Sequence, residues 1–119
     1  MRTATIQIRK ANEALEAARA GFLSAWESGE YAGEHFSFES PAALFRVLTP
    51  KRWELIECLQ KIGPTGVRAL ARALGRDVKR VHADASAMIG IGMIEKTPEG
   101  KLMVPFAEIR ADFVMRPAA

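Results

Sequence analysis

The chain of 119 residues is 49% apolar and 26% charged, with a formal net charge of +3, a composition typical of one globular domain. No apolar run approaches the roughly 18 residues that cross a bilayer, and the N-terminus lacks the continuous apolar segment of a secretory signal. The single cysteine, Cys58, excludes an intrachain disulfide, so we expect a cytoplasmic protein that is not attached to a membrane.

The N-terminal part is predicted to form a strand and then a long helix. Residues 3–9 alternate between apolar and polar, which indicates a half-buried strand. From residue 10 to about residue 28, an apolar stripe recurs at helical spacing: Ala11, Ala14, Leu15, Ala18, Phe22, Ala25 and Trp26. Packing of this stripe on the domain core and self-association through it both remain open. Residues 29–39 have no clear period and predict a linker or loop.

Two helices with the same start signal are expected next. Ser40-Pro41 and Thr49-Pro50 each combine an N-cap residue with a proline at the first helical position. The first helix should end near Leu48 and the second near Ile62, where Gly63-Pro64 stops it. The second helix has a wide apolar face, made of Trp53, Leu55, Ile56, Leu59 and Ile62, and Cys58 is interpreted as a half-buried thiol on it.

Residues 63–104 predict two short helices joined by a tight turn, followed by a small hairpin. The helical period of Val67, Leu70, Ala71 and Leu74 is interrupted at Gly75-Arg76-Asp77. It restarts with a buried side of Val78, Val81, Ala85 and Met88 and stops at Gly92. Residues 94–104 then turn at Thr97–Gly100, with Ile94, Leu102 and Val104 facing the core. This order is typical of a module that lays its second helix in a DNA groove.

The C-terminal residues alternate again and predict a second half-buried strand. Ile109, Ala111, Phe113 and Met115 fall on one side, and we expect this strand to pair with residues 3–9. An isolated pair would be marginal, so it should pack on the N-terminal helix or on a second subunit. The expected fold is mainly α with a small β component (α+β). Its segments are residues 1–36 for dimerisation or partner binding, 37–104 for DNA binding, and 105–119 as C-terminal strand and tail.

Residues with the spacing of an enzyme site or a metal site are not found in the sequence. The two histidines, His35 and His82, have no second His or Cys at metal-ligand spacing. Gly90-Ile91-Gly92 is interpreted as a helix end and not as a phosphate loop, and no nucleophile–base pair is suggested. We therefore predict no catalytic residue, no cofactor, no metal and no enzymatic activity.

The positive charge is concentrated in one part of the chain. Residues 1–40 carry a balance of −2, residues 41–104 carry +5, and residues 105–119 are neutral. Between Arg68 and Arg80 there are five basic residues and one acid, Asp77. Such a face attracts polyanions, although solvated helix surfaces carry similar charges. Charge by itself therefore leaves both interpretations open.

Position within the two-helix motif favours DNA contact. Lys79 and Arg80 lie in the first turn of the second helix, where a groove-entering helix touches bases or backbone, and arginine is suited to guanine O6 and N7. Other DNA-contact candidates are His82, Ala83 and Ser86 on the solvent side of that helix, Arg68, Arg72 and Arg76 for phosphates, and Lys96 and Lys101 from the hairpin. For each basic residue, a solvated surface charge is the alternative interpretation.

Three segments resemble a known family. They are Phe38-Glu39-Ser40-Pro41, the stretch from Leu48 to Ile56, and the stretch from Arg68 to His82. Together with Ile91-Gly92-Met93-Ile94, Val104-Pro105-Phe106 and Glu108-Ile109-Arg110, they resemble small prokaryotic winged helix-turn-helix proteins described as MarR-like or as predicted transcriptional regulators. The resemblance covers roughly Phe38 to Phe113. It departs from the family at Ala83, where many members have a polar or basic residue.

The resemblance implies a winged helix-turn-helix fold and sequence-specific binding to double-stranded DNA, normally as a homodimer. Some members resemble antitoxins, so the rival hypothesis is a protein that neutralises a neighbouring toxin, with or without autoregulatory DNA binding. A winged helix that binds only protein is a third hypothesis. The alanines that follow the first turn of the second helix offer no hydrogen-bonding groups. Lys79, Arg80 and the hairpin of residues 94–104, which would be the wing, should therefore supply most of the DNA binding.

Overall fold

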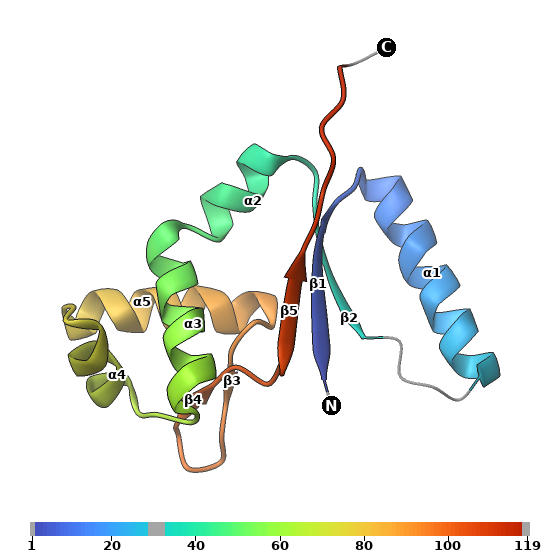
Figure 1. Cartoon of the computed structure of the whole chain (residues 1–119). Helices are drawn as coiled ribbons and strands as arrows, with labels where there is room; N and C mark the ends of the chain where they lie inside the picture. The colour runs from blue at the N-terminus through green and yellow to red at the C-terminus, as the bar shows by residue number, and fades with distance from the viewer. Residues whose placement is uncertain (1, 29–32, 118–119) are drawn as a thin grey trace. The chain divides into compact units, whose positions relative to one another are not determined.

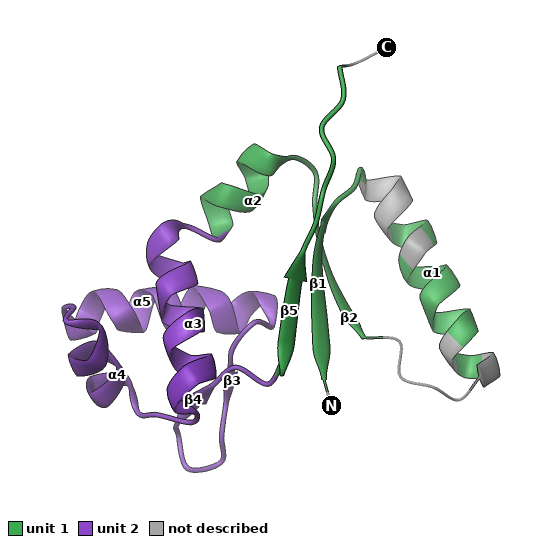
Figure 2. Cartoon of the chain, in the orientation of Figure 1, with its two compact units in different colours: residues 1–47, 106–119 green, residues 48–105 purple. Residues whose placement is uncertain are grey.

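The computed structural model describes residues 2–28 and 33–117 and has a mixed α+β architecture (Figure 1). The chain divides into two compact units, which Figure 2 distinguishes by colour. Unit 1 contains residues 1–47 and 106–119, and unit 2 contains residues 48–105. This division differs from the three expected segments, because the helix after Ser40 and the C-terminal strand both belong to unit 1. Among the described residues, no helix has the length and apolar character of a membrane span.

Unit 1 is built on a three-stranded sheet with the order β2-β1-β5. Its strands are β1 (Thr3–Ile8), β2 (Glu34–Phe38) and β5 (Glu108–Ala111), and both neighbours of β1 run parallel to it. The predicted pairing of the two terminal strands is confirmed, with Ala4 opposite Ile109. Parallel neighbours require long connections. A long helix separates β1 from β2, and unit 2 lies between β2 and β5 in the chain.

The prediction of a loop through residue 39 is wrong for residues 34–38, which form β2. Phe36 and Phe38 lie opposite Ile6 and Ile8 and therefore share a face of the sheet with them. The alternation of these two phenylalanines is too short to stand out in the sequence. Pairing with β1, some thirty residues away, is what makes this segment a strand. Residues 29–32 of the expected loop lie outside the described residues.

Two helices complete unit 1: α1 (Ala11–Ser28) and α2 (Pro41–Val47). The Ser40 Oγ accepts a hydrogen bond from the Ala43 amide at 3.0 Å, which confirms the predicted N-cap. On α1, Leu15, Phe22 and Trp26 are exposed, so these three members of the apolar stripe do not pack on the core. The side chains of Ala11, Ala14 and Ala25 lie outside the described residues. The buried core residues of unit 1 are Ala4, Ile6, Leu44 and Phe106.

The C-terminal strand is shorter than its alternating sequence indicates. β5 ends at Ala111, and the side chains of Phe113 and Met115 are exposed. The expectation of a half-buried strand that continues to Met115 is therefore wrong beyond Ala111. The pairing with β1 stops where Ile6 lies opposite Ala111, although β1 itself continues to Ile8.

Unit 2 contains three helices and a hairpin: α3 (Pro50–Ile62), α4 (Val67–Leu74), α5 (Val78–Ile91), β3 (Glu95–Lys96) and β4 (Leu102–Met103). The helices contact one another, and β4 contacts α3. The Thr49 Oγ1 accepts from the Arg52 amide, as its N-cap role requires. The buried side chains are Leu48, Leu55, Ile56, Leu59, Leu70, Ala71, Val81, Ala85, Met88, Met93, Ile94 and Leu102. Ile62 and Val78, which were expected on buried faces, are exposed at helix ends.

Candidate nucleic-acid interface

A tight connection sets the relation between α4 and α5. Gly75 adopts the left-handed conformation, with φ 66° and ψ 35°, and its amide donates to the carbonyls of Ala71 and Arg72. This conformation suits glycine because it has no Cβ. Two residues later, the Asp77 carboxylate accepts a hydrogen bond from the Arg80 amide at 3.3 Å and caps α5. The chain thus stops one helix and starts the next within three residues.

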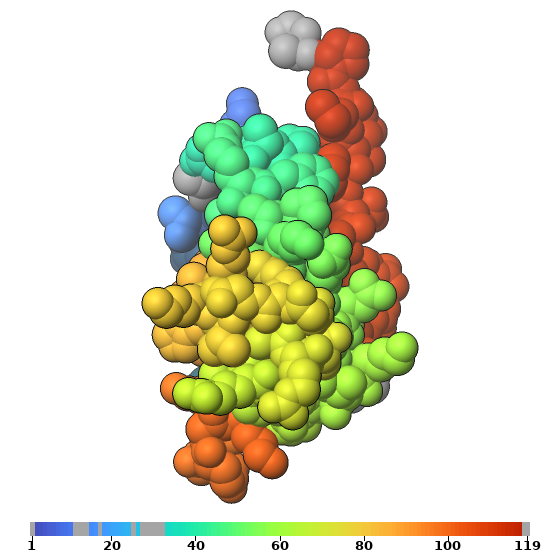
Figure 3. All heavy atoms as spheres, turned by 90° about the vertical axis from the view of Figure 1, so that its left-hand side faces the viewer, coloured from blue at the N-terminus to red at the C-terminus, as the bar shows by residue number. Residues whose placement is uncertain are grey.

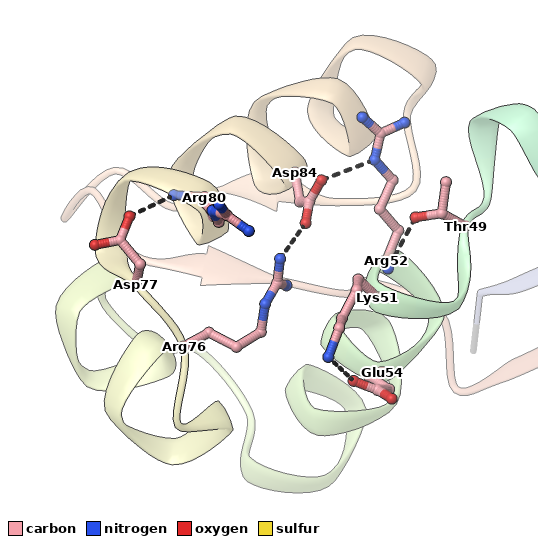
Figure 4. Close-up of polar contacts among 8 residues, drawn as sticks. All are labelled: Thr49, Lys51, Arg52, Glu54, Arg76, Asp77, Arg80 and Asp84. Atoms are coloured by element: carbon pink, nitrogen blue, oxygen red, sulfur yellow. Dashed lines mark hydrogen bonds and ion pairs between the residues drawn. The ribbon is translucent and has the colours of Figure 1, made fainter.

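An ion-pair network centred on Asp84 joins α5 to α3 and to the α4–α5 turn (Figure 4). One carboxylate oxygen of Asp84 accepts from Arg52 Nε at 3.0 Å, and the other accepts from Arg76 Nη2 at 2.8 Å. The side chains are largely buried, with exposed fractions of 17% for Asp84, 23% for Arg52 and 13% for Arg76. The network therefore joins α3, the α4–α5 turn and the middle of α5 through one carboxylate.

The charge state of Asp84 follows from these contacts. Burial raises the pKa of the carboxyl, but the hydrogen bonds and the positive charges of Arg76 and Arg52 outweigh it. The net effect is a pKa below the ordinary value for an aspartate. Asp84 is thus a carboxylate at neutral pH, and its single charge offsets one of the two positive charges that it joins.

The predicted contact residues on α4 and α5 are all exposed. Lys79, Arg80, His82, Ala83 and Ser86 are exposed on α5. The two helices contact each other, and Figure 3 shows the face that carries both of them, in yellow-green for α4 and yellow for α5. On α4, the exposed cations are Arg68 and Arg72. Two helices in contact thus each carry exposed cations, and Lys79 and Arg80 in the first turn of α5 are exposed.

The comparison with known families adds one finding. A model of the HVO_A0114 family matches residues 47–111, more than half of the chain. The chain belongs to the HVO_A0114 family. No curated protein and no solved structure matches it. The matched region contains the whole of unit 2 and extends through β5.

Arg76 is the exception among the expected phosphate contacts. Its guanidinium lies inward against Asp84, whereas Arg68 and Arg72 remain exposed. The sequence interpretation also missed Arg52 and Asp84. Asp84 carried a signal, because it lies three residues after Val81 and four before Met88, on the side of α5 that is buried. A carboxylate at such a position requires a cationic partner. Nothing in the local sequence identifies Arg52, which is 32 residues away.

The hairpin contributes two further exposed cations, Lys96 and Lys101. Its turn is closed by the Thr97 amide, which donates to the Lys101 carbonyl at 2.7 Å, and by the Lys101 amide, which donates to the Thr97 Oγ1 at 3.1 Å. Leu102 also exchanges two backbone hydrogen bonds with Thr65, at 2.8 and 2.9 Å. The hairpin is therefore bonded to the residues that precede α4.

Unit 2 as a whole is basic. It holds ten Lys and Arg residues against six Asp and Glu residues. Of these acids, Asp84 is paired with Arg52 and Arg76, and Asp77 caps α5. In residues 2–28 and 33–117, no group of three His, Cys, Asp or Glu side chains is arranged to hold a metal ion. The chemistry that this surface offers is the binding of anions by arginine and lysine.

Proposed function

We propose that the protein is a transcription regulator that binds double-stranded DNA sequence-specifically through a winged helix-turn-helix and acts as a homodimer. In this proposal α4 and α5 are the helix-turn-helix, α5 is the recognition helix, and the β3–β4 hairpin is the wing. The observation that carries the proposal is the exposure of Lys79 and Arg80 in the first turn of α5, together with the exposure of Arg68 and Arg72 on α4, which contacts α5. The activity is binding alone, with no catalytic step.

The first turn of α5 would contact bases. A major groove is about 12 Å wide and admits one helix. With its N-terminus directed into that groove, α5 offers Arg80 for a two-bond contact with guanine and Lys79 for a base edge or a phosphate. Farther along the helix, His82 and Ser86 supply hydrogen-bonding groups, while Ala83 offers only a methyl group. Specificity would therefore depend mainly on the first turn.

Phosphate contacts would position this helix. Arg68 and Arg72 lie one turn apart on α4 and are both exposed, so they can bind the backbone beside the groove. Lys96 and Lys101 would reach the backbone or an adjacent minor groove from the wing. Arg76 is left out of this set because it is paired with Asp84. In a two-fold dimer, the half-sites would lie about 10 base pairs, or a multiple of that, apart.

The experiment is a DNA-binding titration with the full chain, on promoter DNA from its own locus and on random DNA, at several salt concentrations. We expect retention of the promoter fragment, with an affinity that falls steeply as salt rises. The double variant Lys79→Ala/Arg80→Ala should lose most of the specific affinity. Arg110→Ala, which removes an exposed cation from unit 1, is the matched control and should bind like the unaltered protein. No binding at low salt, or full binding by the double variant, would reject the proposal.

A further inference from the structure

Helix α1 presents a row of large side chains to solvent. Leu15, Phe22 and Trp26 have exposed fractions of 73%, 66% and 79%, and Arg19 is exposed between them. The rings of Phe22 and Trp26 stack on each other, with centroids 6.4 Å apart. Large apolar side chains rarely gather at such exposure on a monomeric protein without a binding role. This row, defined as Leu15, Arg19, Phe22 and Trp26, is called the α1 seam.

The spacing of the α1 seam is symmetric. Its members are separated by four, three and four residues, which is the spacing of the core positions in a coiled coil. The pattern is the same when it is read from either end. When two such helices are placed antiparallel, Leu15 of each copy lies opposite Trp26 of the other, and Arg19 lies opposite Phe22. The seam is therefore complementary to a second copy of itself.

The paired residues match in size and in chemistry. Trp26, the largest side chain of the seam, meets Leu15 and not a second tryptophan. Arg19 meets an aromatic face, on which a guanidinium is stabilised by about 0.5–1 kcal/mol at exposed sites. This pairing also brings nearly the whole of α1 into overlap, because its centre of symmetry lies between Ala20 and Gly21, close to the middle of Ala11–Ser28. A charged residue at one core position is a known way to fix the register of a helix pair.

The area of the seam is large enough for a specific interface. A phenylalanine or tryptophan buries about 150–250 Å² when it is covered, so the seam and the neighbouring exposed Leu23 offer roughly 500 Å². A second copy contributes the same area, and the total of about 1,000 Å² reaches the lower bound for a specific interface. The symmetric spacing of the seam identifies a second copy as the partner. We propose that two copies of the chain pair through antiparallel α1 helices, along the seam of Leu15, Arg19, Phe22 and Trp26.

The first test is the oligomeric state of the full chain, measured by sedimentation across a range of concentrations. The unaltered protein should be a dimer, and Phe22→Glu/Trp26→Glu should weaken dimerisation by at least about 100-fold. In that variant Trp53 is the remaining tryptophan, so its fluorescence reports whether unit 2 stays folded. Val114→Glu/Met115→Glu is the control, because it adds the same charges at exposed apolar residues of the C-terminal tail. A monomeric unaltered protein, or a dimer that survives the seam variant, overturns the inference.

The second test is the direction of the helices. In a Cys58→Ser background, the double variant Leu15→Cys/Trp26→Cys should form a cross-linked dimer on mild oxidation, because the two positions face each other between copies. Leu15→Cys by itself should remain un-cross-linked. A link between two copies of the single variant would mean a parallel pair and would overturn the antiparallel register. Capture of a different protein by the seam, with the chain itself monomeric, would overturn the inference as well.

This inference rests on the proposed function only in that both include a dimer, and the two can fail separately. Lys79→Ala/Arg80→Ala should remain a dimer while losing operator DNA. A dimer held by the seam that binds no DNA would reject the regulator and keep the inference. DNA binding by a protein whose dimerisation is unchanged by the seam variant would support the regulator and overturn the inference.

Discussion

The Asp84 carboxylate accepts a hydrogen bond from Arg76 Nη2 at 2.8 Å, and this contact relates the start of α5 to its middle. Arg76 precedes the N-cap of the helix, while Asp84 lies two turns into it. Asp84 also accepts a hydrogen bond from Arg52 of α3, so one carboxylate joins α5 to α3 and to the α4–α5 turn. In the proposed regulator, this network holds Lys79 and Arg80 in place without contacting DNA.

Removal of the Asp84 carboxylate should destabilise unit 2. Asp84→Ala leaves two largely buried guanidinium groups without their shared partner, and some solvent access reduces the cost relative to a fully buried pair. We expect a loss of about 2 kcal/mol in the free energy of unfolding, measured by urea denaturation. Glu54→Ala, which breaks the exposed Lys51–Glu54 pair at 3.9 Å, should change it by less than about 0.5 kcal/mol. Equal effects of the two variants would contradict a structural role for the network.

The contribution of Asp84 should depend on pH in a defined direction. Its folded-state pKa is depressed, so its stabilisation is fully present above the unfolded pKa of about 3.9 and is lost as pH falls through the folded pKa. The difference in unfolding free energy between the unaltered protein and Asp84→Asn should be constant near neutral pH and should shrink below about pH 3.9. Denaturant titrations at a series of pH values measure it. A difference in unfolding free energy that grows as pH falls would contradict a lowered pKa of Asp84 in the folded protein.

Arg80 should matter for its shape as well as for its charge. A lysine keeps the positive charge but cannot form the two parallel hydrogen bonds to guanine. Arg80→Lys should therefore lower affinity for operator DNA by about 10-fold or more while leaving affinity for random DNA nearly unchanged. Arg72→Lys, at a proposed phosphate contact, should leave both nearly unchanged. Competition binding at fixed salt distinguishes these results, and a uniform loss on both DNAs would place Arg80 on the backbone.

The turn between α4 and α5 should be sensitive to one substitution. Gly75 has φ 66° with open space around its Cα, so Gly75→Ala introduces backbone strain without a clash. We expect a loss of about 1 kcal/mol in unfolding free energy. Gly90→Ala is the matched control, because Gly90 lies inside α5, also in open space, and alanine there should stabilise by about 0.5–1 kcal/mol. Thermal unfolding should show a lower midpoint for Gly75→Ala and a higher midpoint for Gly90→Ala than for the unaltered protein.

The sequence was informative where structure is local. The caps Ser40, Thr49 and Asp77 and the break at Gly75 act within a few residues of themselves, and the structure confirms each of them. The sequence interpretation failed at β2, because Phe36 becomes a strand residue only through its pairing with Ile6. It also placed Arg76 with the phosphate contacts, since the local sequence does not show that Asp84 takes up its guanidinium.

The sequence itself determined the order of helices, turn and hairpin in unit 2 and the basic character of their surface. Capping, helical period and charge are properties of neighbouring residues. Tertiary structure decided which of those charges remain exposed, which strands form the sheet, and that the large side chains of α1 face solvent. These outcomes depend on contacts between residues far apart in the chain, such as Arg52 with Asp84 and Ala4 with Ile109. The energy of such contacts is set by burial, which a local pattern does not contain.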